Sequence, residues 1–438
     1  MPAPKSGRWL RRLAWVALAG LLAVAWNLKH PLLYWLRPYE MPLLLAVVVL
    51  GGAAGMWRRT PQRHLSAGRR SLVVGLSALA GLTLWRQWEF EADRRSVLAG
   101  GNDLQMLGEH FVVGFRSFSE VEPLAVKGLI GGIYLTRRNL ATGGAATVAA
   151  QIARLQDSRR LAGLPPLIVA ADQEGGPVAH LSPWLERLPA LSSLVGATPR
   201  ESLAAQARRH GRKQGAALAA LGVNLNLAPV VDLRPPEPDS AADILTAIGG
   251  RAIDDDPAVV TEVAQAYVAG LADAGVGATL KHFPGLGRVR ADTHLRRASL
   301  NATTDDLRAD WQPFRHVGNG SHAAIMLGHV VLPDVDPECA VSHSRLVVQQ
   351  ILRREWGYQG VLITDDLNMG AVYGQGIGRV AAQSLAAGVD LILVSYDPDQ
   401  YFRALSGAAR ALARGEIDRQ MLQASRQRLP RIRPHAAS

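Results

Sequence analysis

KHFPGLG, residues 281–287, decides the fold of this chain, because it directly follows the apolar run VGATL at residues 276–280. A short continuous apolar run that ends in a glycine-rich polar segment predicts a buried strand that opens into a loop. A second end of this kind is Asp365-Asp366, which follows residues 360–364. The C-terminal ends of barrel strands surround one mouth, so the two segments predict a shared site.

Short apolar runs recur along the chain and are separated by longer amphipathic stretches, such as residues 201–221 and 258–274. The runs are 111–115, 130–135, 167–171, 223–228, 276–280, 323–327, 360–364 and 389–394. Eight continuous apolar strands that alternate with helices predict a parallel (β/α)8 barrel of the TIM type over residues 100–430. A doubly wound open sheet is the alternative fold, although it does not need eight such runs.

Ionisable residues follow five of these runs. They are Asp172 and Glu174, Asp232, Lys281 and His282, His329, and Asp365 and Asp366. One such residue is usually a solvated loop residue or a helix cap, but five at one edge indicate a site. Paired Gly-x-Gly-x-x-Gly motifs are absent from the sequence, which argues against a dinucleotide-binding site. A metallohydrolase is the natural competitor, but His-Glu-x-x-His is also absent and Lys281 would repel a cation, so we expect no metal and no cofactor.

The basic charge of the chain is confined to its N-terminal part. Residues 1–95 carry 14 Lys and Arg against 4 Asp and Glu, a net +10, whereas the remainder carries 34 against 33. A nucleic-acid partner would need clustered basic residues on the folded domain, so we expect none. The single cysteine, Cys339, rules out an intramolecular disulfide and a cysteine-based zinc site.

Residues 1–95 are predicted to form a membrane anchor with two or three transmembrane helices that contact the lipid bilayer. Three apolar stretches, 13–28, 41–57 and 71–85, are each near the short end of the spanning range of about 17 to 25 residues. Tryptophans crowd their ends, as interfacial aromatic residues do. A cleavable signal peptide is the alternative interpretation of the first stretch.

Loop charges predict the orientation of this anchor. Four Lys and Arg precede the first stretch, two lie between the first and second, and five lie between the second and third. Basic loops stay in the cytoplasm, so three crossings predict a multi-pass protein of a bacterial inner membrane with residues 100–430 in the periplasm. If the third stretch does not cross, these residues lie in the cytoplasm instead.

Four motifs together resemble glycoside hydrolase family 3, in particular its single-domain β-N-acetylhexosaminidases that trim cell-wall muropeptides. The motifs are Asp172–Gly176, Asn226–Asp232, Lys281–Gly287 with Asp292-Thr293-His294, and Ile363–Met369. The resemblance spans about residues 100–430 in the family's order. It implies a barrel that hydrolyses a carbohydrate, namely a glycan or muropeptide with a terminal N-acetylglucosamine.

The resemblance implies a retaining mechanism in which Asp365 is the nucleophile and His294 is the acid/base, with Asp292 beside it. An imidazole titrates near neutrality, and an adjacent carboxylate orients it and stabilises its charged form. The resemblance also implies that Asp366 points back into the scaffold. Without the preceding motif, residues 292–294 would be interpreted as a surface turn.

The resemblance further implies that Asp172, Arg251, Lys281, His282 and His180 hold the sugar, since charged groups bind hydroxyls strongly. Lys281 could instead be an ordinary ion-pair partner at the barrel mouth. The chain departs from the family pattern at four positions. The family has arginine at Pro177 and His180, histidine at Leu286 and proline at Ala298, which puts the substrate in question more than the reaction.

The sequence therefore predicts a membrane-anchored exo-β-N-acetylglucosaminidase that acts on peptidoglycan or its fragments. One alternative is an enzyme of the same family with another donor sugar, or one that transfers the sugar to phosphate rather than to water. A second alternative is a catalytically silent, membrane-tethered sugar-binding module, which the departures at Pro177, His180 and Leu286 favour.

Overall fold

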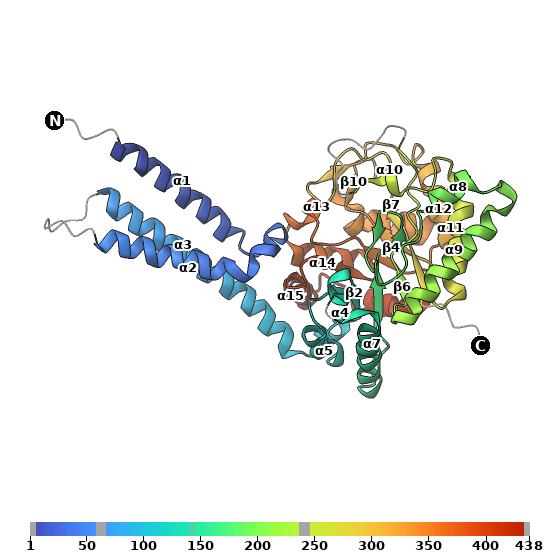
Figure 1. Cartoon of the computed structure of the whole chain (residues 1–438), viewed down its shortest axis with the longest axis horizontal. Coiled ribbons are helices and arrows are strands. Elements are labelled where there is room, and N and C mark those ends of the chain that lie inside the picture. Colours follow the sequence, from blue (N-terminus) through green and yellow to red (C-terminus); the bar gives the residue numbers. More distant parts are fainter. Residues whose placement is uncertain (1–5, 58–66, 142, 236–245, 433–438) are drawn as a thin grey trace. The chain divides into compact units, whose positions relative to one another are not determined.

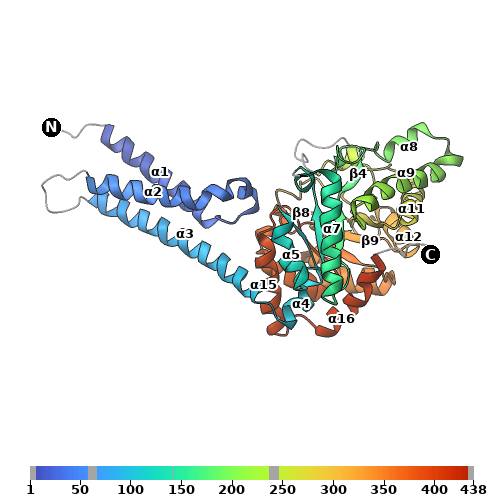
Figure 2. The ribbon, with the colours of Figure 1, turned by 60° about the horizontal axis from the view of Figure 1, so that its bottom comes forward.

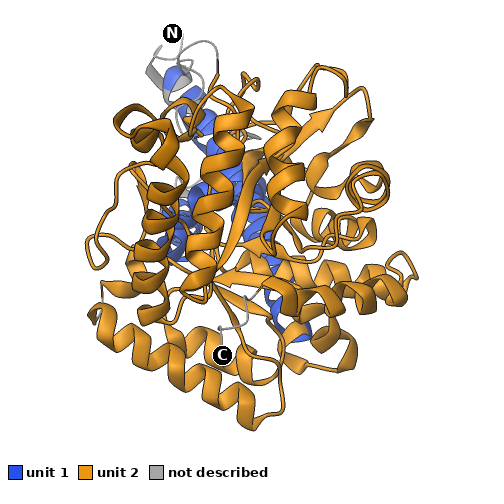
Figure 3. Cartoon of the chain, turned by 90° about the vertical axis from the view of Figure 1, so that its right-hand side faces the viewer, with its two compact units in different colours: residues 1–96 blue, residues 97–438 orange. Residues whose placement is uncertain are grey.

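The computed structural model describes residues 6–57, 67–141, 143–235 and 246–432. The chain divides into two compact units, Met1–Ser96 and Val97–Ser438, which Figure 3 distinguishes by colour. The first unit is helical, and the second contains every strand found among the described residues.

The first unit is built from apolar helices. They are α1 (Ser6–Trp26), the 3-10 helix η1 (Pro31–Leu36), α2 (Arg37–Trp57) and α3 (Ala67–Ala99). Leucines such as Leu18, Leu44 and Leu79 pack between them, whereas Val49 and Leu50 are exposed. Side chains of this kind on the outer surface favour an apolar environment around the helices.

Among the described residues, one helical stretch, Pro31–Ala53, is long and apolar enough to cross a membrane, with a mean hydropathy of 1.4. The shorter apolar helix Arg12–Trp26 would be about 22 Å long, below the roughly 30 Å of a bilayer core. The third predicted span, residues 71–85, lies within α3 between Arg70 and Arg86. The multi-pass prediction is therefore not supported, because charged residues shorten the apolar part of α3.

The second unit contains an eight-stranded parallel sheet in the order β12-β9-β7-β6-β3-β2-β1-β13. The strands are β1 (Phe111–Gly114), β2 (Gly132–Leu135), β3 (Ile168–Ala171), β6 (Leu225–Asn226), β7 (Gly277–Phe283), β9 (Ala324–Leu327), β12 (Leu362–Thr364) and β13 (Ile392–Val394). A bridge between Ile363 and Leu391 joins the two ends of this order. The predicted barrel of parallel strands is confirmed.

Helices alternate with these strands and cover the barrel (Figures 1 and 2). They are α4 (Asn102–Gly108), α5 (Phe118–Val126), α6 (Arg137–Leu140), α7 (Gly144–Leu161), α8 (Ser192–Ala197), α9 (Arg200–Leu221), α10 (Ile248–Arg251), α11 (Pro257–Asp273), α12 (Arg308–Asn319), η2 (Val341–His343), η3 (Leu346–Glu355), α13 (Gly370–Tyr373), α14 (Ile377–Ala387), α15 (Gln400–Ala413), α16 (Arg419–Arg428) and η4 (Leu429–Ile432). Glycines let α9 approach α11 closely, since a Cβ at Gly211 would lie 2.3 Å from the carbonyl oxygen of Tyr267.

Short strands follow the C-terminal ends of three barrel strands. The hairpin of β4 (Gln173–Gly175) and β5 (Val178–Ala179) comes directly after β3. A second small sheet contains β8 (Ala298–Ser299), β10 (Val330–Leu332) and β11 (Asp336–Ala340). Because these segments continue from the C-terminal ends of β3, β7 and β9, they build the rim of the barrel mouth.

The seam between β12 and β13 depends on a buried carboxylate. Asp390 is fully buried and accepts a hydrogen bond of 2.8 Å from the backbone nitrogen of Leu362. Arg353 and Arg428 donate to the same carboxylate at 2.6 and 2.8 Å, and Ser425 donates at 2.7 Å. A buried charge needs partners of this kind, and here they link two distant segments to the seam.

Candidate active site

The structure gathers most of the predicted site residues at the barrel mouth. Asp172 follows β3, Lys281 and His282 lie in β7, and Asp365 follows β12. His294 lies in the loop that leaves β7. The pKa of Asp365 responds to the charges of both His282 and His294, so these three side chains share one electrostatic environment.

A buried ion-pair network forms one side of this mouth. Lys281 contacts Asp172, and its Nζ also lies 2.6 Å from Glu174 Oε1. Arg251 holds the same Glu174 through two hydrogen bonds, at 3.0 Å from Nε and 2.7 Å from Nη2. Arg251 and Lys281, both predicted to hold the sugar, are thus joined by a carboxylate that the prediction had not assigned.

The carboxylates of this network stay ionised because the neighbouring cations neutralise them. Burial alone would raise the pKa of Asp172, but Lys281 and His180 outweigh it and keep that pKa well below its usual value. Burial acts on Glu174 in the same direction, yet Arg251 and Lys281 lower its pKa. The network therefore presents ionised carboxylates and ammonium and guanidinium donors, which suit hydrogen bonding to sugar hydroxyls.

Tyr134, at the end of β2, connects Asp172 with His180. Its hydroxyl donates to Asp172 Oδ2 at 2.7 Å and lies 3.0 Å from His180 Nδ1. A hydroxyl that donates to the carboxylate can accept from the imidazole, which places the proton on His180 Nδ1. The histidine at position 180 is therefore held against Asp172 through a tyrosine rather than by direct contact.

His282 is fixed by the buried Asp232. Its Nδ1 lies 2.8 Å from Asp232 Oδ2, and its backbone nitrogen donates to both carboxylate oxygens at 3.1 Å. The backbone nitrogen of Leu286 donates to Asp232 Oδ1 at 2.8 Å. Asp232 thus orients the imidazole and the start of the following loop, and Nε2 of His282 lies 3.4 Å from Arg251 Nη2.

His294 is held by Asp292 and Thr246. Its Nδ1 lies 3.1 Å from Asp292 Oδ1, and the same oxygen accepts from its backbone nitrogen at 2.9 Å. Thr246 Oγ1 lies 3.3 Å from both Asp292 Oδ1 and His294 Nδ1. An ionised carboxylate can only accept, so Nδ1 carries the proton in this pair and Nε2 is left to exchange protons.

The loop that carries His294 is tied to the segment that follows Asp365. The backbone nitrogen of Gly370 donates to the carbonyl oxygen of His294 at 2.7 Å, and that of Ala371 donates to Thr293 at 3.1 Å. A Cβ at Gly370 would lie 2.4 Å from the carbonyl oxygen of Leu295, so this close approach needs glycine. Two distant strand ends are thereby joined by backbone hydrogen bonds.

The two adjacent aspartates have different surroundings. Asp366 accepts hydrogen bonds from the backbone nitrogens of Asn368, Ser395 and Tyr396 and from two side chains, at 2.7 to 3.0 Å. Asp365 is instead influenced by the imidazoles around it. Burial raises its pKa, but His282, His329 and His294 outweigh burial and lower it. Asp366 therefore holds the backbone after β13, as predicted, whereas the carboxylate of Asp365 favours its ionised form.

His329 completes the surroundings of Asp365 from the end of β9. Its Nε2 donates to the carbonyl oxygen of Asp366 at 3.0 Å, and its Nδ1 lies 2.8 Å from Ser342 Oγ. Ser342 in turn lies 3.2 Å from His343 Nδ1. Burial lowers the pKa of His329 and brings that of His343 to about 4, so both imidazoles favour their neutral form.

The family model described as "Glycosyl hydrolase family 3 N terminal domain" matches residues 103–432. The chain belongs to glycosyl hydrolase family 3. Among its relatives is a "Beta-hexosaminidase" of Xanthomonas campestris pv. campestris (strain B100), 40% identical over 285 residues that cover 64% of this chain and 81% of the relative. Another is a "Beta-hexosaminidase" of Nitrosomonas eutropha, 37% identical over 62% of this chain and 75% of the relative.

Solved structures that are similar to this chain share its fold. A glycoside hydrolase family 3 β-N-acetylglucosaminidase from Paenibacillus sp. str. FPU-7 superposes with a TM-score of 0.68 at 32% identity, covering 75% of this chain. The chain spans 61% of the length of that Paenibacillus protein. A β-N-acetylhexosaminidase from Beutenbergia cavernae gives a TM-score of 0.66 at 29% identity, covering 76% of this chain and 98% of the other.

Several residues of this family 3 site were not assigned from sequence. The strand-end pattern picked out Glu174, Asp232 and His329 as ionisable residues but gave them no role in the site. Tyr134 lies within an apolar run and gave no such signal. Among the residues that the structure describes, no three His, Cys, Asp or Glu side chains are grouped as a metal site requires.

Proposed function

We propose that this family 3 protein is a retaining exo-β-N-acetylglucosaminidase that removes terminal β-linked N-acetylglucosamine from peptidoglycan or its fragments. The names of the relatives support the sugar, and the motif that links Asp365 with Asp292 and His294 supports the mechanism. The observation that carries the proposal is the pair of hydrogen bonds from Gly370 and Ala371 to the His294 loop, because they tie the segment that follows Asp365 to the loop that carries His294.

The reaction follows from these positions. An oxygen of Asp365 attacks the anomeric carbon and forms an ester, while the bond from that carbon to the aglycone oxygen breaks. The leaving oxygen takes the proton from Nε2 of the charged His294. A water then gives a proton back to Nε2, attacks the anomeric carbon and releases Asp365. Asp292 stabilises the charged imidazole, and Thr246 fixes its ring.

The buried ion-pair network holds the terminal sugar in this proposal. Asp172 accepts from sugar hydroxyls, while Lys281 and Arg251 donate to them, and His282 lies beside Arg251. Because both carboxylates are neutralised by cations before substrate arrives, binding does not require a charge to be buried at that moment. Tyr134 sets the position of His180 at the same subsite.

The first unit attaches the enzyme to a membrane in this proposal, with the stretch Pro31–Ala53 as its spanning or signal-anchor segment. We infer that the membrane is a bacterial inner membrane and that the basic residues before residue 13 lie in the cytoplasm. A single crossing by Pro31–Ala53 then leaves the barrel in the periplasm. A reporter fused after Ser438 that is active only in the periplasm supports this orientation, and one active only in the cytoplasm contradicts it.

The test is hydrolysis of 4-nitrophenyl N-acetyl-β-glucosaminide by the full chain in detergent. Asp365→Asn should lower kcat at least about a thousandfold, because the nucleophile is lost. Asp305→Asn is the matched control, since Asp305 is an exposed aspartate paired with Arg308. Proton NMR should show the β-anomer of the product first. Activity that survives Asp365→Asn, or an α-anomer formed first, refutes the mechanism.

A further inference from the structure

Three buried side chains form a series of hydrogen bonds that ends at the backbone next to Asp365. His329 Nδ1 lies 2.8 Å from Ser342 Oγ, and the same oxygen lies 3.2 Å from His343 Nδ1. The three residues, called the histidine network below, are 1%, 0% and 3% exposed in this order. The reaction proposed for Asp365 and His294 uses none of them, so their place beside the nucleophile needs an explanation.

A backbone carbonyl fixes the direction of every hydrogen bond in the histidine network. His329 Nε2 lies 3.0 Å from the carbonyl oxygen of Asp366, and a carbonyl oxygen can only accept, so Nε2 carries a proton. When the ring is neutral, Nδ1 is a lone pair and Ser342 donates to it. The oxygen of Ser342 then accepts from the Nδ1–H of His343. Each neutral imidazole therefore has one tautomer.

The opposite direction is unfavourable at both ends of the network. If Ser342 donated to His343, Nδ1 of His329 would need a proton in addition to the one on Nε2, and a buried ring would be charged. The proton of His343 would also have to move to its Nε2. That nitrogen is buried and has no hydrogen-bond partner among the residues that the structure describes. The network therefore favours the neutral form of His329.

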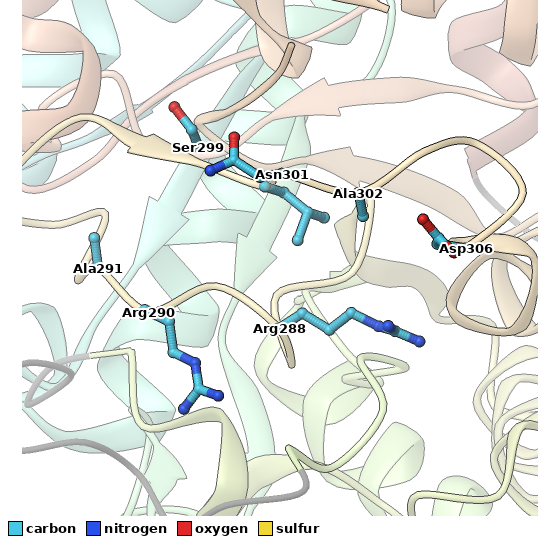
Figure 4. Close-up of a pocket in the computed structure, with 8 residues that line it drawn as sticks. Arg288, Arg290, Ala291, Ser299, Asn301, Ala302 and Asp306 are labelled. Atoms are coloured by element: carbon cyan, nitrogen blue, oxygen red, sulfur yellow. The ribbon is translucent and has the colours of Figure 1, made fainter. Parts of the chain in front are cut away.

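The protein's own groups set these proton positions. A cavity of about 400 Å³ on the rim of the barrel (Figure 4) is lined by Arg288, Arg290, Ala291, Asp306 and residues 299–302. No member of the histidine network lines this cavity. Water in the cavity therefore does not replace the hydroxyl of Ser342 as the donor to His329.

Charged groups act on both imidazoles from several elements. Burial is the largest influence and lowers both pKa values, that of His343 to about 4. The charges of Asp365 and Asp366 oppose burial at His329, whereas His294 acts with it. At His343 the groups are His329, Arg297 and Arg379, which lower the pKa, and Asp336, which raises it. The two aspartates would thus draw a proton onto His329 if its Nδ1 were left open.

A neutral His329 suits the reaction proposed for Asp365. The transition state of a glycosidase resembles an oxocarbenium ion and carries positive charge. A charged imidazole beside the nucleophile would oppose that charge and would hold the carboxylate in an ion pair. The neutral ring donates instead to the carbonyl of Asp366, whose backbone nitrogen donates to Asp365 Oδ1 at 2.8 Å. The ring thereby fixes the backbone next to the nucleophile without adding a charge.

We propose that Ser342 and His343 are positioning residues that keep His329 neutral, with its proton on Nε2, beside the nucleophile. The inference rests on the proposed function, because it needs Asp365 as the nucleophile. Ser342 supplies the donor that occupies Nδ1 of His329. His343 donates to the oxygen of Ser342 and so directs the hydroxyl proton toward His329. Both residues act through His329 and not on the substrate.

The experiment is the pH profile of kcat for 4-nitrophenyl N-acetyl-β-glucosaminide, measured with the full chain in detergent. In Ser342→Ala the Nδ1 of His329 is open, so the ring should titrate nearer to the ordinary histidine value of about 6.5. The acidic limb of the profile should move up by about one pH unit, which lowers kcat about tenfold at a pH on that limb. At pH 8 kcat should be close to that of the unmodified chain, and KM should change little.

Paired variants separate the hydrogen bonds from packing. Ser342→Thr keeps the hydroxyl and should restore the profile. His343→Asn keeps an N–H donor near the position of Nδ1 and should retain the profile, whereas His343→Phe removes the donor and should move the acidic limb upward. Ser384→Ala is the matched control, because Ser384 is fully buried and donates to the carbonyl oxygen of Val380 within α14 at 2.9 Å. It should leave the limb in place.

An acidic limb that stays in place in both Ser342→Ala and His343→Phe overturns the proposal. A fall in kcat of equal size at every pH also overturns it, because that result indicates a packing defect alone. If Ser342→Ala does not fold, the comparison of His343→Asn with His343→Phe decides. These outcomes leave the proposed hydrolase intact, since each is measured against an active unmodified chain.

If the unmodified chain does not hydrolyse the substrate, the proposed function fails and a second measurement tests the network. Nitrogen-15 NMR of the histidine-labelled full chain distinguishes neutral from charged imidazoles, and His329→Gln identifies the signals of His329. A neutral ring with Nε2–H at pH 6 that becomes charged in Ser342→Ala supports the proposal. A charged His329 in the unmodified chain at pH 6, or the same ring state in both proteins, overturns it.

Discussion

Lys281 is the cation on which the buried carboxylates of the mouth depend. Its side chain is 2% exposed and contacts both Asp172 and Glu174. Removing one partner of a buried pair costs about 3 to 5 kcal/mol, because a charge is left uncompensated. Arg251 still neutralises Glu174 after Lys281→Met, so we expect the lower end, a loss of about 3 kcal/mol in the free energy of unfolding at pH 7.

The dependence on pH gives this prediction a second signature. In the unmodified protein the pKa of Asp172 lies below its usual value, so its ionised form stabilises the fold above about pH 4, and that contribution is lost as the pH falls through the folded pKa. Without Lys281 this pKa rises. The destabilisation caused by Lys281→Met should therefore be largest at neutral pH and should shrink below about pH 4.

Urea unfolding followed by near-ultraviolet circular dichroism at pH 7 and at about pH 3 measures both effects. Adding Asp172→Asn to Lys281→Met should recover part of the loss, because the unpaired carboxylate is removed. Lys213→Met is the matched control, since Lys213 is exposed and pairs with Glu186, and it should change stability by less than about 0.5 kcal/mol. A loss below about 1 kcal/mol for Lys281→Met, or no recovery in the double variant, refutes the reasoning.

Two further substitutions test groups near the mouth. His343→Phe should remove a loss of stability that the unmodified protein shows in acid. Burial brings the pKa of His343 to about 4, so the unfolded chain binds a proton at this residue at a higher pH than the folded protein does. The free energy of unfolding of the unmodified protein should therefore fall by about 3 kcal/mol between about pH 6.5 and pH 4. Equal pH dependence of the urea midpoint in both proteins would falsify this. Tyr134→Phe should raise KM about fivefold with little change in kcat, because Asp172 and His180 lose their shared hydroxyl; steady-state kinetics decide, and an unchanged KM contradicts the role.

The barrel could be predicted from the sequence because each strand is a continuous apolar run that ends in a polar residue. The strands β7 and β12, with Lys281 and Asp365 at their ends, are examples. Burial on both faces removes the alternation that an exposed sheet shows, which makes such runs visible. The resemblance also implied that Asp366 points back into the scaffold, and the hydrogen bonds that it accepts from the backbone after β13 agree with this.

The partners of the site residues could not be predicted in the same way. Glu174 lies two residues from Asp172, but its pairing with Arg251 joins residues 77 positions apart and depends on side-chain directions. Thr246 precedes a short helix and carries no chemical signature of its own. The anchor was overestimated because apolar length was counted without the charged residues that bound residues 71–85 in α3.

Closure of the barrel at Asp390 has a consequence for heat inactivation. The bridge between Ile363 and Leu391 joins β12 to the residue before β13, and Asp365 stands two residues beyond Ile363. Amide exchange should therefore be faster along this seam than between β2 and β3, which pair at four positions. Parting of the seam would displace Asp365 while the other strands stay paired, so the enzyme would stop working at a temperature where its far-ultraviolet spectrum is still that of the folded protein.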